Sequence, residues 1–366
     1  MMKTKLCNTC FYKTNLCNKN TLAAVVAIFA MTLSGCSNNE QATSANDDLD
    51  EVTTLRFSHF LTASDNINTE GFEPWAKKIE EESNGRLKVE IYPSSTLSEA
   101  GATYDASAKG TIDIGMQVQG YTAGRFPLTQ IVELPGISNT GQQQTCILYK
   151  LYDDGVISDE YADTHLISLM GTGQGALHTV DTPIRKPGDM KGMRIRQPSV
   201  VASHVIDALD AAPIGLPMGD VYTSLQRGVI DGMAVTWQPI QAFRLDELLN
   251  THTNIPFYNS TIVVSMNKDK YNSLPDDLKK VIDDNSGIEM STRIAKIFDD
   301  SNAKAMAAAR AKGDTMIDIP DPLNDLDWRD PLLKGTQEYL DEVAKQGLDS
   351  KAVYEQVKAA STTCKV

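Results

Sequence analysis

The fold is most constrained by a pattern that occurs twice in the chain. Each copy has an alternating strand closed by proline, then a helix, then a glycine followed by Ile-Asp and a short apolar segment. The first copy uses residues 86–95, Pro93, Gly110 and Ile112-Asp113, and the second uses 191–200, Pro198, Gly228 and Ile230-Asp231. Strands that alternate with helices favour parallel sheets covered by helices. Two copies therefore predict an α/β fold of two similar lobes with mostly parallel sheets.

The chain is also expected to cross between these lobes more than once. We expect residues 52–174 and 263–300 in lobe I, and residues 175–262 and 301–366 in lobe II. A helical pattern over 275–313, with proline at its start and glycine at its stop, predicts one long helix that touches both lobes. Gly287 is a place where this helix can kink. Lobes joined in this way predict a hinged clamp that closes on a ligand in the cleft.

The amino terminus has the order of an export signal. Residues 1–20 carry lysines and no acidic residue, an apolar run too short to span a bilayer follows, and Leu33-Ser34-Gly35-Cys36 ends it. A cysteine at the cleavage point is typical of a bacterial lipoprotein, in which Cys36 becomes the first residue and carries acyl chains. An ordinary signal peptide with a chance cysteine is the less favoured alternative. Residues 1–35 are therefore predicted to be removed, and the acidic, polar residues 36–51 to form a flexible tether.

This interpretation predicts a periplasmic or cell-envelope protein whose lipid is its only attachment to the membrane. The whole chain has a net charge of −14, and the removed residues carry four lysines, so the remainder has a net charge of −18. Such acidity argues against nucleic acid as a partner, because nucleic-acid-binding proteins present basic surfaces. Of the cysteines that remain, Cys146 and Cys364 could pair in an oxidising compartment, but the sequence leaves this open. No metal site and no cofactor are predicted.

Candidate ligand-binding residues follow the predicted strands, because ligands of open α/β sheets meet the carboxyl ends of strands. The candidates are His59, Phe60, Gln119, Tyr121, Gln174, Arg196, Trp237 and Gln238. These are amides, aromatic residues and one arginine, with hardly any carboxylate. Arginine offers a planar, bidentate fork to a carboxylate, and amides and aromatic faces can define the rest of a ligand. The strand ends therefore predict a site for an organic acid.

Each candidate also has a plainer interpretation. Arg196 could form a surface salt bridge with one of the many acidic residues, although its position at a strand end favours ligand contact. His59 is equally compatible with a hydrogen bond at the cleft and with a loop near the surface. Tyr121 and Trp237 are expected to stack on the ligand, but aromatic residues at strand ends often belong to the core rim. Arg125 is expected to brace a loop.

Four segments together resemble the TRAP-transporter solute-binding proteins of the DctP type. They are "KGTIDIGMQ", "DMKGMRIRQP", "PMGDVYTSLQRGVIDGM" and "NKDKYNSLPDDLKKVID", in this order, and the resemblance covers about residues 52–345. It implies a periplasmic binding protein-like clamp that takes an organic acid and delivers it to a TRAP-type membrane permease. It also implies that Arg196, in the "KG-x-x-I-R" strand, binds the ligand's carboxylate. Arg194 alternates to the opposite face of that strand, so this role does not extend to it.

Departures from one branch of the resembled family narrow the expected ligand. The sialic-acid-binding branch has a second arginine near the position of Ala176 and an asparagine where Val235-Thr236-Trp237-Gln238 stands here. One cation fewer, with an indole and an amide added, argues against sialic acid and small dicarboxylates. A monocarboxylate with an apolar or aromatic body is the expected ligand.

Two other classes of function were weighed against a binding protein. A carboxylate receptor that reports to a signalling partner is compatible with the resemblance. An exported enzyme on a carboxylated substrate is less favoured, because the sequence has no GxSxG or HExxH motif. The segment "GTGQGA" at 171–176 loosely matches a dinucleotide loop, but a strand-like segment follows it where a phosphate-binding helix is needed. We therefore expect a binding protein and no enzyme.

Overall fold

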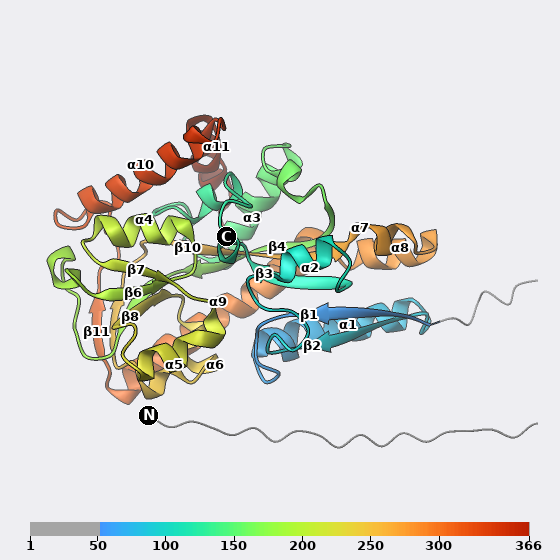
Figure 1. Cartoon of the computed structure of the whole chain (residues 1–366), viewed down its shortest axis with the longest axis horizontal. Helices are drawn as coiled ribbons and strands as arrows, with labels where there is room; N and C mark the ends of the chain where they lie inside the picture. The colour runs from blue at the N-terminus through green and yellow to red at the C-terminus, as the bar shows by residue number, and fades with distance from the viewer. Residues whose placement is uncertain (1–51, 366) are drawn as a thin grey trace, which may run out of the picture. The chain divides into compact units, whose positions relative to one another are not determined.

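The computed structural model describes residues 52–365. The predicted signal segment 1–35, the lipidation site Cys36 and the tether 36–51 lie outside the described residues. The described part of the chain is α/β and contains two sheets, one in each lobe (Figure 1), as the repeated pattern predicts. Within residues 52–365, no helix combines the length and apolarity that a membrane span requires.

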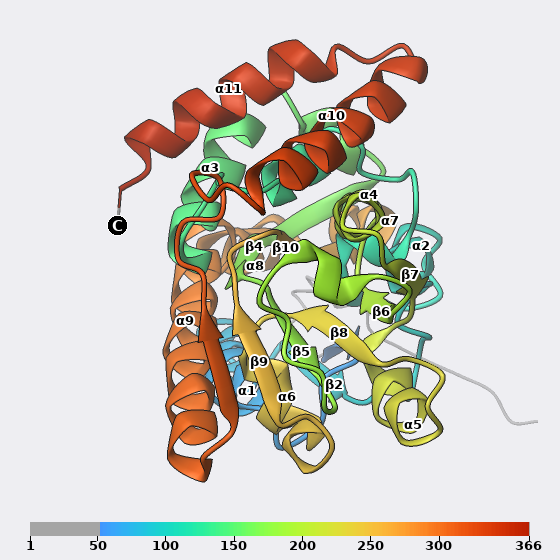
Figure 2. The ribbon, with the colours of Figure 1, turned by 90° about the vertical axis from the view of Figure 1, so that its left-hand side faces the viewer.

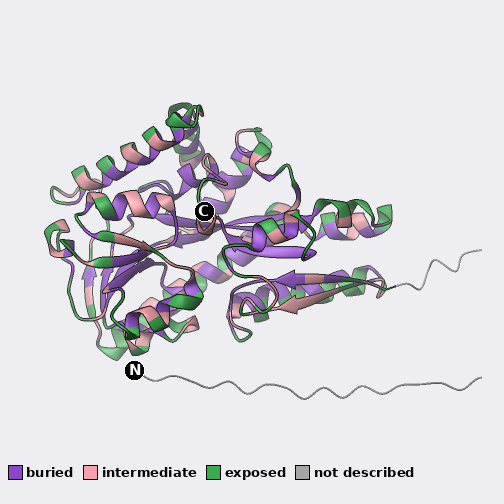
Figure 3. Ribbon diagram, viewed as in Figure 1, coloured by how far each residue is buried: buried purple, intermediate pink, exposed green. Residues whose placement is uncertain are grey.

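Lobe I is built on a five-stranded sheet with the order β2-β1-β3-β10-β4. Its strands are β1 (Thr53–Ser58), β2 (Leu87–Tyr92), β3 (Ile114–Val118), β4 (Thr164–Gln174) and β10 (Asn259–Asn267). The helices of this lobe are η1 (Ile67–Phe72), α1 (Glu73–Glu82), α2 (Thr103–Ala108), η2 (Gln119–Tyr121), η3 (Thr129–Glu133), α3 (Gly141–Asp153), η4 (Ser158–Tyr161) and α7 (Lys268–Asn272). β3 and β10 are buried along their whole length, which makes them the centre of the lobe (Figure 3).

Lobe II is built on a six-stranded sheet with the order β11-β9-β5-β8-β6-β7. Its strands are β5 (Ala176–Thr179), β6 (Arg194–Gln197), β7 (Ala212–Gly215), β8 (Gly232–Val235), β9 (Thr251–Asn254) and β11 (Thr315–Asp318). Its helices are η5 (Pro187–Met190), α4 (Val200–Ala208), η6 (Met218–Asp220), α5 (Val221–Gln226), α6 (Gln238–Ala242) and η7 (Leu245–Glu247). The Ser199 hydroxyl accepts a hydrogen bond from the Ala202 N–H and so caps the start of α4.

Both sheets are mixed, with a parallel part and an antiparallel part. Five of the nine strand pairings in the described chain are parallel. Every antiparallel pairing involves β5 or β10, the strands that follow the two crossings between the lobes, at Gly175 and at 255–258. Residues 259–262 therefore belong to the sheet of lobe I, whereas the sequence analysis assigned them to lobe II.

The structure corrects the alignment of the two repeats by one strand. β2-β1-β3 in lobe I corresponds to β7-β6-β8 in lobe II, because β1 and β6 are each the middle strand of a parallel triplet. The strand that ends before Pro93 thus corresponds to β7, which is followed by Pro217. The sequence analysis had paired it with β6. The "Ile-Asp" match was placed correctly, since Gly110 and Gly228 both have positive φ and both precede a central strand.

The aspartate of each "Ile-Asp" pair makes the same hydrogen bonds in both lobes, to an arginine on the middle strand of the parallel unit. Asp113 accepts hydrogen bonds from the backbone N–H and Nε of Arg56 on β1, at 2.8 and 2.9 Å. Asp231 accepts the same two bonds from Arg194 on β6, at 2.8 and 3.0 Å. The repeated motif therefore fastens the third strand of each parallel unit to its middle strand. It also occupies Arg194 on the face of β6 opposite Arg196.

The predicted helix over 275–313 is two helices. α8 (Asp276–Asp284) ends before Asn285, and α9 (Gly287–Lys312) begins after Ser286. Gly287 adopts a φ of 79°, which L-residues rarely adopt, so the chain turns there instead of kinking. α9 does contact elements of both lobes, including β4 and α3 of lobe I and α6 of lobe II. It ends at Gly313, whose left-handed conformation suits a helix C-cap.

The carboxyl-terminal helices lie over both lobes. α10 (Arg329–Lys345) packs on α4 of lobe II, and α11 (Ser350–Thr363) packs on α3 and η3 of lobe I (Figure 2). The assignment of 301–366 to lobe II alone was therefore wrong for α11. A disulfide between Cys146 on α3 and Cys364 fastens the end of α11 to lobe I, which answers the pairing that the sequence left open.

Candidate functional site

A cavity lies between the two lobes. Most of its walls are apolar, as is usual for small-molecule sites. Lobe I contributes Phe60, Leu61, Val118, Tyr121, Thr172, Ser260, Ile262 and, from α9, Phe298; lobe II contributes Arg196, Pro198, Met218, Val235, Thr236, Gln238, Pro239 and Phe243; Tyr258 comes from the second crossing between the lobes. Because both lobes supply walls, a molecule in this cavity would hold them together.

Arg196 is the one cation among the cavity-lining residues of the described chain. It stands near the end of β6 and is 1% exposed. No carboxylate of residues 52–365 forms an ion pair with it. Its guanidinium donates instead to the carbonyl oxygens of Leu216 and Ala234, at 2.8 and 3.2 Å. A buried charge without a counter-ion is costly, so a bound anion would be strongly favoured here.

Two tyrosines stand beside this guanidinium. The Tyr121 hydroxyl accepts hydrogen bonds from Nη2 of Arg196 at 3.2 Å and from the Met218 N–H at 3.1 Å. Tyr121 therefore links lobe I to lobe II and keeps its own proton free to donate. The Tyr258 hydroxyl is buried and has no hydrogen-bond partner within residues 52–365. Burial raises the pKa of Tyr258, against the opposing influence of the Arg196 charge, so its phenol stays protonated and can donate to an anion.

The sequence analysis missed Tyr258 because it precedes a strand and follows no predicted strand end. Its position depends on Gly175, at the first crossing between the lobes. A Cβ on Gly175 would come within 2.0 Å of the Tyr258 ring. The Gly175 N–H also donates to the Tyr258 carbonyl oxygen at 2.9 Å. The sequence does contain a glycine at one crossing and an aromatic residue at the other, Gly175 and Tyr258. That these two residues face each other is visible only in the tertiary structure.

Four predicted candidates line the cavity: Phe60, Tyr121, Arg196 and Gln238. Phe60 contacts the Tyr121 ring edge-on, with the ring centroids 5.8 Å apart. Gln238 begins α6, directly after β8, and is 3% exposed. The structure thus brings together residues from the ends of β1, β3, β6 and β8, as the rule of carboxyl strand ends predicts.

Trp237 lies outside the lining of this cavity. Its side chain packs against Ala305 and Ala309 of α9. Its ring also contacts His178 and His252, with centroid separations of 4.7 and 4.8 Å. Consecutive residues at the start of α6 point in different directions, which is why Gln238 reaches the cavity and Trp237 does not.

Three further candidates lie elsewhere, and two of them, His59 and Gln119, are buried. His59 is hydrogen-bonded to Oδ1 of Asn68 at 2.9 Å, and burial lowers the pKa of His59 to about 4. Gln119 donates to the hydroxyl of Tyr161 at 2.7 Å. Gln174 lies within β4, since that strand continues to the crossing, and it donates to Oδ1 of Asn139. None of the three is among the residues that line the cavity.

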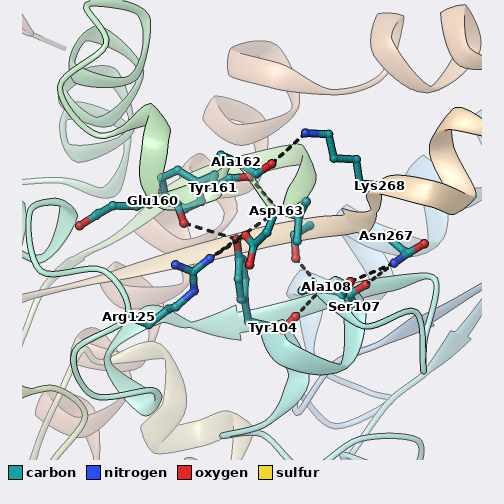
Figure 4. Close-up of polar contacts among 12 residues, drawn as sticks. Tyr104, Ser107, Ala108, Arg125, Glu160, Tyr161, Ala162, Asp163, Asn267 and Lys268 are labelled. Atoms are coloured by element: carbon teal, nitrogen blue, oxygen red, sulfur yellow. Dashed lines mark hydrogen bonds and ion pairs between the residues drawn. The ribbon is translucent and has the colours of Figure 1, made fainter.

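Arg125 braces a loop, as the sequence analysis expected. Its Nη2 donates to Oδ1 of Asp163 at 2.6 Å and to the Tyr104 hydroxyl at 3.3 Å (Figure 4). The guanidinium carbon also lies 4.9 Å from the centre of the Tyr104 ring, within cation–π range. These contacts join the residues after β3 to the start of β4. Arg125 is thereby committed to lobe I and does not line the cavity.

A buried carboxyl group lies behind the cavity wall. Glu133 is fully buried, and its Oε1 accepts hydrogen bonds from the N–H and hydroxyl of Thr261, at 3.0 and 2.6 Å. Its Oε2 has no partner within residues 52–365. Burial raises the pKa of Glu133 to about 7, although the bonds from Thr261 oppose this. Thr261 lies between Ser260 and Ile262, which line the cavity, so this carboxyl group supports β10 from behind.

Glu133→Gln is expected to make the protein more stable at pH 8 relative to the parent. Between pH 4.5 and about 7 the unfolded chain loses the Glu133 proton while the folded chain keeps it, so rising pH favours unfolding. The accumulated loss is about 3 kcal/mol, and a neutral amide avoids it. Urea unfolding of both proteins at pH 4.5 and pH 8 measures the difference. An identical pH dependence for parent and variant would show that Glu133 ionises normally in the fold.

The arrangement is suited to binding and offers little for catalysis. Within residues 52–365, no group of three or more His, Cys, Asp or Glu side chains could hold a metal ion. The lining contains no acidic residue and no histidine that could act as a general base. A guanidinium, two phenols and an amide in an apolar cavity can instead fix a carboxylate and enclose its body.

Comparison with known proteins shows clear similarity. Residues 57–343 match bacterial extracellular solute-binding protein, family 7, or DctP. A TRAP solute-binding protein from Rhodoferax ferrireducens T118, solved with copurified benzoate, is 29% identical, with a TM-score of 0.80 over 86% of this chain and 98% of its own. A marine metagenome TRAP solute-binding protein specific for aromatic acid ligands, solved with 3-hydroxybenzoate, is 30% identical, with a TM-score of 0.81 over 86% and 100%.

A curated relative is more distant in sequence. The monocarboxylate 2-oxoacid-binding periplasmic protein of Nostoc sp. is 25% identical over 300 residues, which are 79% of this chain and 79% of that protein. The similarity therefore extends over both lobes and beyond the residues around the cavity.

Proposed function

The chain belongs to the DctP family of bacterial extracellular solute-binding proteins, and on this premise we propose that it captures a monocarboxylate with an apolar or aromatic body in the cavity between its lobes. TRAP solute-binding proteins take small organic acids and deliver them to a TRAP-type membrane permease, and they are receptors and not enzymes. This protein accordingly acts outside the cytoplasm. The lipid anchor at Cys36 stays a prediction from the sequence, which the mass of the mature amino terminus would test.

The observation that carries the proposal is the buried guanidinium of Arg196 in an otherwise apolar cavity. Arg196 makes three hydrogen bonds within residues 52–365, so two of its five N–H groups remain for a ligand. Tyr121 and Tyr258 each have a hydroxyl proton to add. One cation matches one carboxylate, and a second carboxylate would be buried without a partner at considerable cost.

The walls of the cavity support an apolar or aromatic body. Phe60, Phe243 and Phe298 surround it together with aliphatic side chains, and burial of such surface against a ring is favourable. The aromatic contacts thus come from phenylalanines and tyrosines, and not from Trp237 as expected from the sequence. Structures of two similar proteins, with benzoate and with 3-hydroxybenzoate, are consistent with this chemistry.

A thermal-shift screen of the purified protein tests the proposal. The panel contains benzoate and phenylacetate, aliphatic monocarboxylates, 2-oxoacids, dicarboxylates, sugar acids and neutral sugars. We expect aromatic monocarboxylates to raise the melting temperature most, because a ligand that binds only the folded state stabilises it. A rise with neutral sugars, or with dicarboxylates alone, would contradict the proposed ligand class.

A further inference from the structure

We propose that Gln238, held by Asp65 from the opposite lobe, is a specificity residue that selects ligands carrying a hydrogen-bond donor on their body. The expected ligand class is then a hydroxylated aromatic monocarboxylate. This inference rests on the proposed function, because it concerns the same cavity and assumes that Arg196 holds the carboxylate.

The first observation that supports this role is that the side-chain oxygen of Gln238 has no hydrogen-bond partner within residues 52–365. Gln238 lines the cavity and is buried. An unpaired amide oxygen in such surroundings costs about 1–3 kcal/mol. Most of the cavity walls are apolar and no side chain of residues 52–365 pairs with this oxygen, which leaves it for a donor on the ligand.

The second support is the fixed direction of the amide. Nε2 of Gln238 donates to Oδ2 of Asp65 at 2.9 Å, and Asp65 lies outside the cavity lining. The other carboxylate oxygen of Asp65 accepts from the Ile67 N–H at 2.8 Å, so the carboxylate is itself anchored. A carboxylate has no proton to give, so it accepts from the NH₂ group and cannot pair with the amide oxygen. The amide oxygen is therefore directed to the cavity. There it can accept a hydrogen bond from a donor on the ligand, but it cannot pair with an acceptor.

The third support is the backbone of Gln238. Its N–H donates to Oδ1 of Asn302 on α9 at 2.8 Å, and Nδ2 of Asn302 donates to the carbonyl oxygen of Thr172 on β4 at 2.9 Å. Gln238 belongs to lobe II, whereas Thr172 and Asp65 belong to lobe I. Asp65 of lobe I holds the side chain of Gln238, and Asn302, itself bonded to lobe I, holds its backbone, so the acceptor is placed only when the lobes are together.

The test compares ligands that differ by one hydroxyl group or by methylation of that hydroxyl. Isothermal titration calorimetry of the parent protein measures the affinities of benzoate, the three hydroxybenzoates and the three methoxybenzoates. We expect at least one hydroxybenzoate to bind about 10-fold or more tightly than both benzoate and its own methoxy counterpart. Equal affinities for every hydroxy and methoxy pair would overturn the inference, and this comparison needs no variant.

Two variants distinguish the role of Gln238, which contacts the ligand, from the role of Asp65, which orients the Gln238 amide. Gln238→Met keeps the length of the side chain but removes the amide, so the preference for hydroxybenzoate over benzoate is expected to fall to about 1-fold. Asp65→Asn frees the amide to rotate and present its NH₂ group, so methoxybenzoate should bind more tightly than it does to the parent. A hydroxyl preference that persists in Gln238→Met would overturn the inference.

Failure of the two proposals can be told apart. If benzoate and the methoxybenzoates bind as well as the hydroxybenzoates, the proposed function stands and the role of Gln238 is wrong. If neither these acids nor any other monocarboxylate of the thermal-shift panel binds the parent protein, the proposed function is wrong, and the role of Gln238 is lost with it. Melting temperatures of the unliganded variants confirm that each is folded before its affinities are compared.

Discussion

Arg196→Ala is expected to lower the affinity for an aromatic monocarboxylate by about 100-fold or more. The bound carboxylate would be buried without its cation, and truncation of one partner in such a pair costs about 2–5 kcal/mol. Arg196→Lys should recover only part of the loss, because an ammonium cannot form the bidentate contact and cannot replace the bonds to Leu216 and Ala234. Titration calorimetry with the best acid of the screen measures both effects.

Arg194→Ala is the matched control for this experiment. Arg194 lies two residues away on the same strand, but it is half-exposed, points to the other face and is paired with Asp231. Its removal deletes an ion pair that contributes about 0–1 kcal/mol and should leave ligand affinity unchanged. Unliganded Arg196→Ala should remain folded, since the guanidinium bonds only to two carbonyls and a phenol. Parent-like affinity in folded Arg196→Ala would disprove the proposed site.

Reduction of the disulfide between Cys146 and Cys364 is expected to lower the free energy of unfolding by about 2–4 kcal/mol. The bond joins residues separated by 218 positions, so it restricts the unfolded chain over most of the two lobes. It also fastens the end of α11 to α3, which already contact each other through buried residues such as Val357. Denaturant unfolding with and without a reducing agent measures the change.

The double variant Cys146→Ser, Cys364→Ser provides the control for that experiment. It should unfold at the same lower denaturant concentration as the reduced parent, and a reducing agent should not affect it further. Ligand affinity should be unchanged, because neither α3 nor α11 contributes to the cavity. A parent protein whose unfolding midpoint is the same when reduced would show that the bond adds nothing to the stability of the fold.

Much of the fold could be predicted because its signals are local. Gly110 and Gly228 mark two chain reversals through a backbone conformation that other residues avoid, and the elements around them follow from residue periodicity. The off-by-one alignment of the repeats has a physical cause as well. Pro93 and Pro198 look alike in the sequence, but the position of a strand in a sheet depends on its hydrogen-bonded neighbours, which the sequence does not list.

The candidate site was predicted only in part. Phe60, Tyr121, Arg196 and Gln238 reach the cavity, because each follows or ends a strand of a parallel unit. Gln119 and His59 occupy equivalent places along the chain, but their side chains are satisfied by neighbours inside lobe I. A strand end fixes where a residue lies, whereas its side-chain direction depends on the local backbone and on the packing around it.

The sequence by itself determined the family and the two α/β lobes, and it predicted the guanidinium that is proposed to meet an acid, because these depend on residue type and on spacing along the chain. Only the tertiary structure decided that Tyr258 stands beside Arg196, that Trp237 turns away, and that Asp65 reaches across to direct the amide of Gln238. These three outcomes depend on contacts between segments far apart in the sequence, and such contacts exist only after the lobes have folded and come together.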